Sequence, residues 1–222
     1  APVKAVASDR QSGNQFGSAV AVSGNYAVVG AADISGGQVS NSAQSAYVYE
    51  RKSTGNWVQV QKLVAPDKEA GDNFGQSVSI SGNYIIVGSP YHSKDANGGN
   101  VMSGAGAAYI FERNASGTWT QVKKLVATDR SANDFFGHSV SISGNYAVVG
   151  SPYDDEDAIG SNTINDAGSA YFFVRNANGS WVLTNKAVAH DRNGPAIFGF
   201  SVSINGDQAV VGAPFESKDT SG

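Results

Sequence analysis

The chain has 222 residues, 41% of them hydrophobic and 15% charged, which is typical of a globular protein with a buried core. Its apolar runs reach four to six residues, whereas a membrane-spanning helix needs roughly 20, and its net charge of −4 includes no basic block that would favour binding to nucleic acid. Cysteine is absent, which excludes disulfides and thiolate metal sites, and 27 glycines favour short strands and turns over long helices.

The dipeptide Phe-Gly recurs along the chain. After a first predicted strand at Val3 to Ala7, it occurs at spacings of 58, 62 and 62 residues, beginning at Phe16, Phe74, Phe136 and Phe198. The same 62-residue step separates Trp57, Trp119 and Trp181. The chain is therefore a tandem repeat, with units at approximately 9–66, 67–128 and 129–190 and an incomplete unit at 191–222.

Each unit is expected to hold four short strands with a turn signal between neighbours. In the third unit the first two strands are Ser139 to Ile142 and Tyr146 to Gly150, joined by Ser-Gly-Asn, whose residues tolerate the positive φ of a two-residue hairpin turn. The third strand is Ser169 to Phe173, and the fourth begins at Trp181. The second strands are apolar on consecutive residues, which indicates burial on both faces, whereas the fourth strands mix Gln and Lys with apolar residues, which suits an outer edge.

Four-stranded sheets with a buried inner side and a polar outer edge indicate an all-β chain. At about 60 residues per unit, the sheets are predicted to be the blades of a β-propeller, three of them complete and one incomplete. A β-solenoid or a string of separate small sheets is the alternative. In the propeller, Phe74, Phe136 and Phe198 are expected to be buried between blades.

The motifs of the repeat resemble those of a known family. Phe-Gly at the start of each unit, with Val-Gly-Ser-Pro at 87–90 and 149–152 and Val-Val-Gly-Ala-Pro at 210–214, is similar to the FG-GAP repeat of integrin-alpha-like β-propellers. The likeness covers the whole chain, and the Ser-Gly-Asn turns look most like those of secreted bacterial members. The resemblance implies a secreted or cell-surface protein and a ring of about seven blades.

The last unit stops before its third strand. Counting the strand at Val3 to Ala7, three complete units and two strands of the fourth, we expect fifteen strands. Unpaired backbone beside the last strand would be costly if buried. We therefore expect the chain either to continue beyond Gly222 or to self-associate through its incomplete blade by edge-to-edge strand pairing.

The densest group of acidic residues follows the second strand of the third unit. Calcium takes six to eight oxygen ligands, so this loop is a candidate calcium site, with a solvated acidic loop as the alternative. The family's Asp-x-Asp-x-Asp-Gly calcium loop lies between the first and second strands, where this chain has the Ser-Gly-Asn turn, so the resemblance does not imply that site. The candidate ligands are Asp154, Asp155, Asp157 and Asp166, and no other cofactor is expected.

Other polar residues are read against the repeat. Aspartates near the start of each unit are expected to bond their own backbone in Asx turns; these are Asp9, Asp67, Asp72, Asp129, Asp134 and Asp191. None of the three histidines, His92, His138 and His190, is required by the repeat, and the shared pattern places no serine or carboxylate beside them. No catalytic residue is therefore expected.

These patterns favour a non-catalytic extracellular module for adhesion, scaffolding or recognition of a protein or carbohydrate. The long variable loops after the second strands, at 31–44, 91–106 and 153–168, are expected to form the contact surface on one face. Candidate ligand-binding residues are Tyr91, Tyr153 and Phe215, which follow Ser-Pro or Ala-Pro; the alternative is that they pack over the blade rim. The competing function is that of a secreted enzyme such as a hydrolase, or an accessory propeller attached to one.

Overall fold

The protein is built from antiparallel β-sheets. The structure, a computed structural model, describes residues 4–9, 14–32, 44–192 and 194–217. Within those ranges there is no helix, and fourteen strands form three four-stranded sheets, here called blades 1, 2 and 3, and one two-stranded sheet, the half-blade. Accordingly, the described residues contain no helix with the length and apolar character needed to cross a bilayer.

The strands follow one another in space as they do in sequence. Blade 1 consists of β1 (Gln15–Ser23), β2 (Tyr26–Ala32), β3 (Ser45–Arg51) and β4 (Trp57–Leu63). Blade 2 consists of β5 (Val78–Ser81), β6 (Tyr84–Ser89), β7 (Ala107–Arg113) and β8 (Trp119–Leu125). Blade 3 consists of β9 (Ser139–Ser143), β10 (Tyr146–Ser151), β11 (Ser169–Arg175) and β12 (Trp181–Ala187), and the half-blade of β13 (Ser201–Asn205) and β14 (Gln208–Gly212).

Burial within a blade follows the expected pattern. In blade 2, five consecutive residues are buried in each of the middle strands β6 and β7. The outer strand β8 exposes its central residues, Thr120 to Lys123, and buries its two ends. The sequence therefore predicted correctly that the second strand is a buried middle strand and that the fourth is a partly exposed outer strand.

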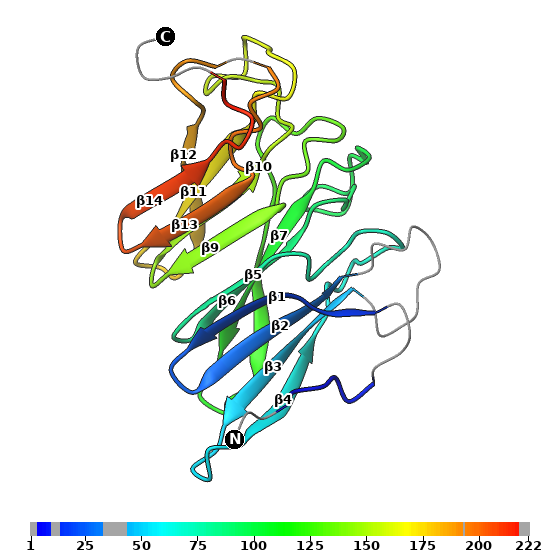
Figure 1. The fold of residues 1–222 in the computed structure, drawn as a ribbon, viewed down its shortest axis with the longest axis vertical. Coiled ribbons are helices and arrows are strands. Elements are labelled where there is room, and N and C mark those ends of the chain that lie inside the picture. The colour runs from blue at the N-terminus through cyan, green and yellow to red at the C-terminus, as the bar shows by residue number, and fades with distance from the viewer. Residues whose placement is uncertain (1–3, 10–13, 33–43, 193, 218–222) are drawn as a thin grey trace.

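The blades lie in a row, with the first strands β1, β5, β9 and β13 next to one another along its middle (Figure 1). The same hydrogen bond recurs at each junction, from the turn glycine of one blade to a serine hydroxyl of the blade before it. It joins Gly82 N to Ser23 Oγ at 3.1 Å, Gly144 N to Ser81 Oγ at 3.0 Å and Gly206 N to Ser143 Oγ at 2.9 Å. Blade 1 and the half-blade lie at opposite ends of the row, so the described residues do not close a ring.

Two glycines bring each pair of adjacent blades into backbone contact. A Cβ on Gly88 in β6 would lie 2.0 Å from the carbonyl oxygen of Gly137, and Gly150 in β10 is placed against Gly199 in the same way. Gly137 itself has a φ of 93°, which favours glycine, and its N–H donates to the carbonyl oxygen of Gly150 at 3.0 Å. The Phe-Gly and Val-Gly motifs thus form the two sides of one contact between blades.

Gly88→Ala is expected to lower the free energy of unfolding by about 3 kcal/mol, because the added methyl group meets fixed backbone and the blades must separate. Gly99→Ala is the matched control, since its Cβ would approach the Asp95 carboxylate no closer than 3.8 Å. Urea denaturation of both variants measures the difference. A loss at Gly88 no larger than at Gly99 would contradict the proposed close contact.

The phenylalanines of the Phe-Gly motif lie between blades. Phe74 and Phe136 are fully buried, as expected, and Phe136 packs in one cluster with residues of blades 2 and 3. Its ring lies edge-on to Tyr171 of β11, with centroids 5.2 Å apart. Phe198 is only half-buried, so its predicted burial was wrong. In the described chain the half-blade has no third strand to supply the rings that surround Phe136.

The N-terminal segment does not form the strand expected at Val3 to Ala7. Val3 lies outside the described residues, and residues 4–7 take no part in a sheet. The segment is held instead by a side chain, because the Tyr49 hydroxyl donates to the carbonyl oxygen of Val6 at 2.7 Å. The expected count of fifteen strands was therefore wrong for the described ranges, which contain fourteen.

Residues that are buried inside the row are exposed at its two ends. Val78 of β5 is 9% exposed, whereas its equivalent in β1, Val20, is 70% exposed. Val210 of β14 is 74% exposed, whereas its equivalent Val148 is fully buried between neighbouring elements. Edge-to-edge pairing of the incomplete blade with another chain stays a prediction.

Candidate functional site

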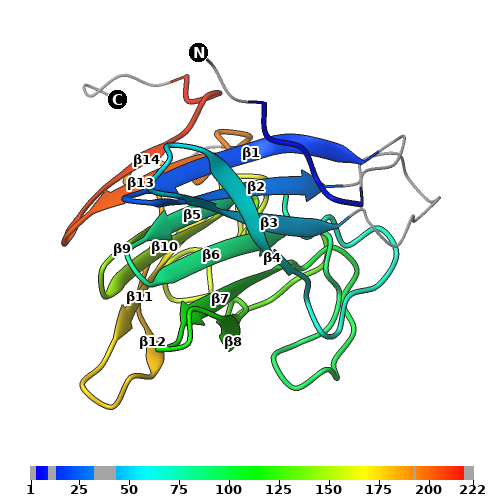
Figure 2. The ribbon, with the colours of Figure 1, turned by 90° about the horizontal axis from the view of Figure 1, so that it is seen from below.

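The long loops that follow the second strands leave the same edge of the row. In an antiparallel four-stranded sheet, the second and fourth strands end, and the third begins, at the same end of the sheet. The loop after the second strand therefore lies beside the linker that follows the fourth. The loops between β6 and β7 and between β10 and β11 therefore lie on the side where the linkers β4–β5 and β8–β9 run (Figure 2). We call this side the loop face. The corresponding loop of blade 1, at 31–44, lies mostly outside the described residues.

Three aromatic side chains on the loop face touch one another and form what we call the aromatic row: Tyr91, Phe135 and Tyr153. The ring centroids of Tyr91 and Phe135 are 4.7 Å apart, and those of Phe135 and Tyr153 are 5.3 Å apart. Tyr91 is 45% exposed and the other two are half-buried. Two of the three predicted contact residues are thus brought together, whereas Phe215, 66% exposed beyond β14, makes no ring contact among the described residues.

The central residue of the row, Phe135, was not identified from the sequence. It has a φ of 53°, a left-handed conformation that is unfavourable for a bulky side chain by about 1–2 kcal/mol. Its equivalent 62 residues earlier is Asn73, with a φ of 55°, and asparagine tolerates this conformation. The sequence did contain a signal, because the residue before Phe-Gly is Asn in the second unit and Phe in the third. The equivalent residue of the fourth unit, Ile197, has a φ of 50°, so the left-handed conformation belongs to the repeat and only the phenyl ring is particular to blade 3.

Arginines from the linkers hold the loops in place. Arg130 donates to the carbonyl oxygens of Ser93 and Asn100, at 2.7 and 3.0 Å, and so binds the loop of blade 2. Arg192 binds the loop of blade 3 in the same way, through the carbonyl oxygens of Asp155 and Asn162 at 2.5 and 2.8 Å. The loops therefore have a fixed conformation before any ligand arrives, which lowers the entropic cost of binding.

An Asp–Tyr–Lys group recurs behind the loop face. In blade 3 the Asp129 carboxylate lies 2.7 Å from the Tyr171 hydroxyl and 2.6 Å from the Lys186 ammonium. The equivalent groups are Asp67 with Tyr109 and Lys124 in blade 2, and Asp9 with Tyr47 and Lys62 in blade 1. The Asx-turn prediction was wrong for Asp9, Asp67 and Asp129, because folding brings a phenol and an amine to their carboxylates. Asp72 and Asp134 do bond nearby backbone, but they accept from the N–H three residues earlier, of Glu69 and Ser131, which is not the predicted Asx turn.

Blades 2 and 3 differ at one position beside this group. In blade 2, His92 is fully buried, with Nδ1 2.8 Å from Asp72 and Nε2 2.8 Å from Lys124. In blade 3 the equivalent residue is Asp154, which is 1% exposed and lies against both Tyr171 and Lys186. An acid therefore replaces a base in a buried site that already contains two other carboxyl groups.

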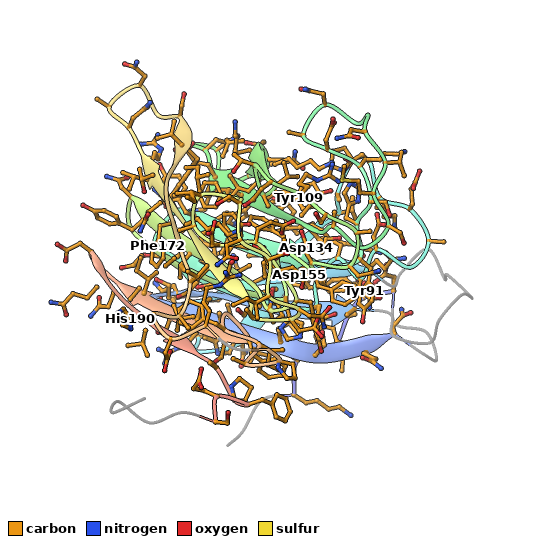
Figure 3. The ribbon with its side chains drawn as sticks, turned by 90° about the horizontal axis from the view of Figure 1, so that it is seen from above. Tyr91, Tyr109, Asp134, Asp155, Phe172 and His190 are labelled. Carbon is orange, nitrogen blue, oxygen red and sulfur yellow. The ribbon has the colours of Figure 1, made fainter. Side chains whose placement is uncertain are left out.

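Blade 3 consequently holds a buried excess of carboxyl groups. Burial, and after it the charges of Asp154, Glu156 and Asp129, raise the pKa of Asp134 to about 7, although the bond from Ser131 N–H acts in the opposite direction. Burial and the Asp154 side chain likewise raise the pKa of Glu156. In the view of Figure 3, Asp134 and Asp155 are labelled toward the middle of the molecule and His190 toward one side.

The four predicted calcium ligands have separate partners. Asp154 faces Tyr171 and Lys186, whereas Asp155 accepts a bond from the backbone N–H of Asp166 at 2.7 Å. Asp157 accepts bonds from two backbone N–H groups of its own loop, and Asp166 accepts one from the Asn165 side chain. In the described ranges no three Asp, Glu or His side chains are arranged to hold a metal ion. Calcium binding by this loop stays a prediction.

A groove opens between the loops of blades 2 and 3. It has a volume of about 530 Å³ and is lined by residues of the β6–β7 loop, of the β8–β9 linker and by Glu156. Met102 and Val126 supply apolar surface, and Asn97 and Asn100 supply amides.

The other two histidines are not part of this groove. His138 packs on the Phe200 ring, with centroids 4.8 Å apart, and His190 is exposed to solvent.

A model of the FG-GAP repeat matches the chain four times, at residues 2–49, 57–111, 119–173 and 181–222. The last three matches begin at the outer strands β4, β8 and β12, and the first three end within the third strands β3, β7 and β11. No curated protein matches the chain in sequence. FG-GAP repeats suggest a β-propeller module of the binding or adhesion type, and they are typical of extracellular proteins.

Proposed function

Because the chain belongs to the FG-GAP repeat family, we propose that it is a non-catalytic binding module, secreted or at a cell surface, that recognises a protein or carbohydrate with its loop face. The observation that carries this proposal is the aromatic row. A phenyl ring lies between two tyrosines at a position where blade 2 has an asparagine. The three rings offer a ligand a continuous aromatic surface on the loop face.

Two further features support the proposal. The groove between the loops of blades 2 and 3 brings together apolar surface, side-chain amides and the charged groups of Arg130 and Glu156, and convergent polar groups orient a ligand in a recognition site. Arg130 and Arg192 fix the loops that border the row, so little order would have to be gained on binding. Aromatic side chains on rigid loops are a common means of recognising both sugars and protein surfaces.

Phe135→Asn is expected to reduce binding about tenfold while leaving stability within about 1 kcal/mol, because relief of the strain offsets the lost ring contacts. Tyr91→Ala should reduce binding similarly. The labelled chain is to be applied to an oligosaccharide array and to intact cells before and after protease treatment, which separates a glycan ligand from a protein ligand. Tyr146→Ala, an exposed tyrosine at the opposite end of its sheet, is the matched control.

The expected result is that both row variants lose binding and the Tyr146 variant keeps it. Equal binding by all three folded variants would show that the aromatic row is not the contact surface. Absence of any binding by the wild-type chain, on the array and on cells alike, would remove the proposed function itself.

A further inference from the structure

Adjacent blades meet through the same apolar contact at successive junctions of the row. Near the middle of the row, the first and second strands of one blade contact the first strand of the next. Between blades 1 and 2, Val28 of the second strand lies in one buried cluster with Val78 and Ile80 of β5. The equivalent residues between blades 2 and 3 are also clustered; they are Ile86, Val140 and Ile142. Each junction therefore needs a specific apolar face on both of its sides.

Serine side chains join the earlier blade to the backbone of the later one. At every junction a serine hydroxyl donates to the carbonyl oxygen of the Phe-Gly glycine: Ser18 to Gly75 at 3.2 Å, Ser77 to Gly137 at 2.8 Å and Ser139 to Gly199 at 2.8 Å. The bond from the turn glycine of the later blade, described above, is the second of the set. Together with the glycine–glycine contact, these bonds fix how one blade sits on another.

The half-blade carries the earlier blade's part of this contact on its outward side. Val210 is equivalent to Val28 and is 74% exposed. Gly212 is equivalent to Gly88, and a Cβ on either would meet the neighbouring serine, but only Gly88 also faces a glycine of a further blade. We call this side the finish face; it consists of Ser201, Asn205, Val210 and Gly212. Asn205 replaces the serine that accepts the turn-glycine bond, and its side-chain oxygen can accept the same bond.

Blade 1 carries the later blade's part of the contact at the opposite end of the row (Figure 1). Val20 and Val22 are equivalent to the two apolar residues of β5 and are 70% and 66% exposed. Gly17 has a φ of 97°, close to the 93° of Gly137, so its backbone already has the conformation used at a junction. No described atom lies within 4 Å of a Cβ built on Gly17. We call this side the start face; it consists of Gly17, Val20, Val22 and Gly24.

We propose that the finish face of one chain binds the start face of a second copy, so that the half-blade packs on blade 1 as blade 1 packs on blade 2. The occupant is a second copy because this molecule already forms the same contact three times between its own blades. Both faces are complete for it, since β13 and β14 are the two strands that an earlier blade contributes and β1 is the strand that a later blade contributes.

The proposed contact is head-to-tail, because two different surfaces meet. A pair of chains therefore has a free start face and a free finish face, and further copies can add unless the assembly closes. The contact also differs from edge-to-edge strand pairing. Here the sheets stack face to face, and no strand of one chain enters a sheet of the other.

The first test is sedimentation velocity of the full chain over a wide range of concentrations. We expect wild type to form dimers and larger species as the concentration rises. Val20→Asp and Val210→Asp should each weaken association on the order of a hundredfold, because either change places an unpaired charge in the contact. Both valines are exposed in the free chain, so thermal melts should show that the variants fold. Val101→Asp, at a 69% exposed position of the β6–β7 loop, is the matched control and should associate like wild type.

The second test mixes the two weakened variants in equal amounts. Val20→Asp keeps its finish face and Val210→Asp keeps its start face, so the mixture should form heterodimers and nothing larger. Only a head-to-tail contact between these two faces gives this result. Wild type that stays monomeric at every concentration would overturn the proposal, as would a mixture without heterodimers. Association that persists in either single variant would point to edge-to-edge pairing or another surface and would overturn it as well.

Discussion

Phe136→Ala is expected to lower the free energy of unfolding by about 3–5 kcal/mol, because the change empties a fully buried site between blades 2 and 3. The ring also makes two edge-on contacts, with Tyr171 and Phe173, which add to the loss. Chemical denaturation of the purified variant measures the effect.

Phe198→Ala is the control for this prediction. It removes the same side chain from the same motif, but at a half-buried position without a third strand beside it. Its loss should be about 1–2 kcal/mol. Equal losses at the two positions would mean that packing between blades contributes less to stability than the structure indicates.

Asp134 is expected to make the protein less stable as the pH rises from about 4 to 7. Its pKa is raised from 3.8 in the unfolded chain to about 7 in the folded one, so the folded state binds more protons between these values. The stabilisation is fully present below pH 4 and is lost as the pH rises through 7, with a total on the order of 4 kcal/mol. The acids whose pKa is lowered, such as Asp67, titrate below this window.

Asp134→Asn should remove most of this decline, with the remainder coming from Glu156, whose pKa is also raised, and should make the protein more stable than wild type at pH 8. Asp72→Asn, the equivalent change in blade 2, removes the carboxylate that faces His92 and should leave the decline in place. Thermal melts between pH 5 and pH 8 test both. Burial is the largest cause of the raised pKa. A wild-type melting temperature that rises steadily from pH 5 to pH 8 would contradict the prediction.

The sequence predicted the blades because their signals are local. Consecutive apolar residues at 85–87 and the Ser-Gly-Asn turns determine strands and hairpins within a few residues of themselves. The partners of Asp129 could not be read in this way, since Tyr171 and Lys186 lie 42 and 57 residues further along the chain. Their regular recurrence in the earlier units was nevertheless a usable signal.

The aromatic row was predicted only in part for a similar reason. Tyr91 and Tyr153 follow proline at the ends of strands, so their place on the loop face follows from the strand order. Phe135 comes from a linker, and its contact with both tyrosines depends on how adjacent blades are stacked. A residue type that conflicts with its backbone conformation is best recognised by comparing equivalent positions, as Asn73 shows.

The unit that repeats in sequence and the unit that folds are out of step by one strand. Each complete family match takes its outer strand from one blade and its next three strands from the following blade, as in 57–111, which joins β4 to β5, β6 and β7. A fragment cut at a repeat boundary such as residue 119 would therefore strip blade 2 of β8 and expose the backbone of β7 as a new edge. Exchange of whole blades between such proteins has to be made in the linkers, within 64–77 or 126–138, where the cut crosses no sheet.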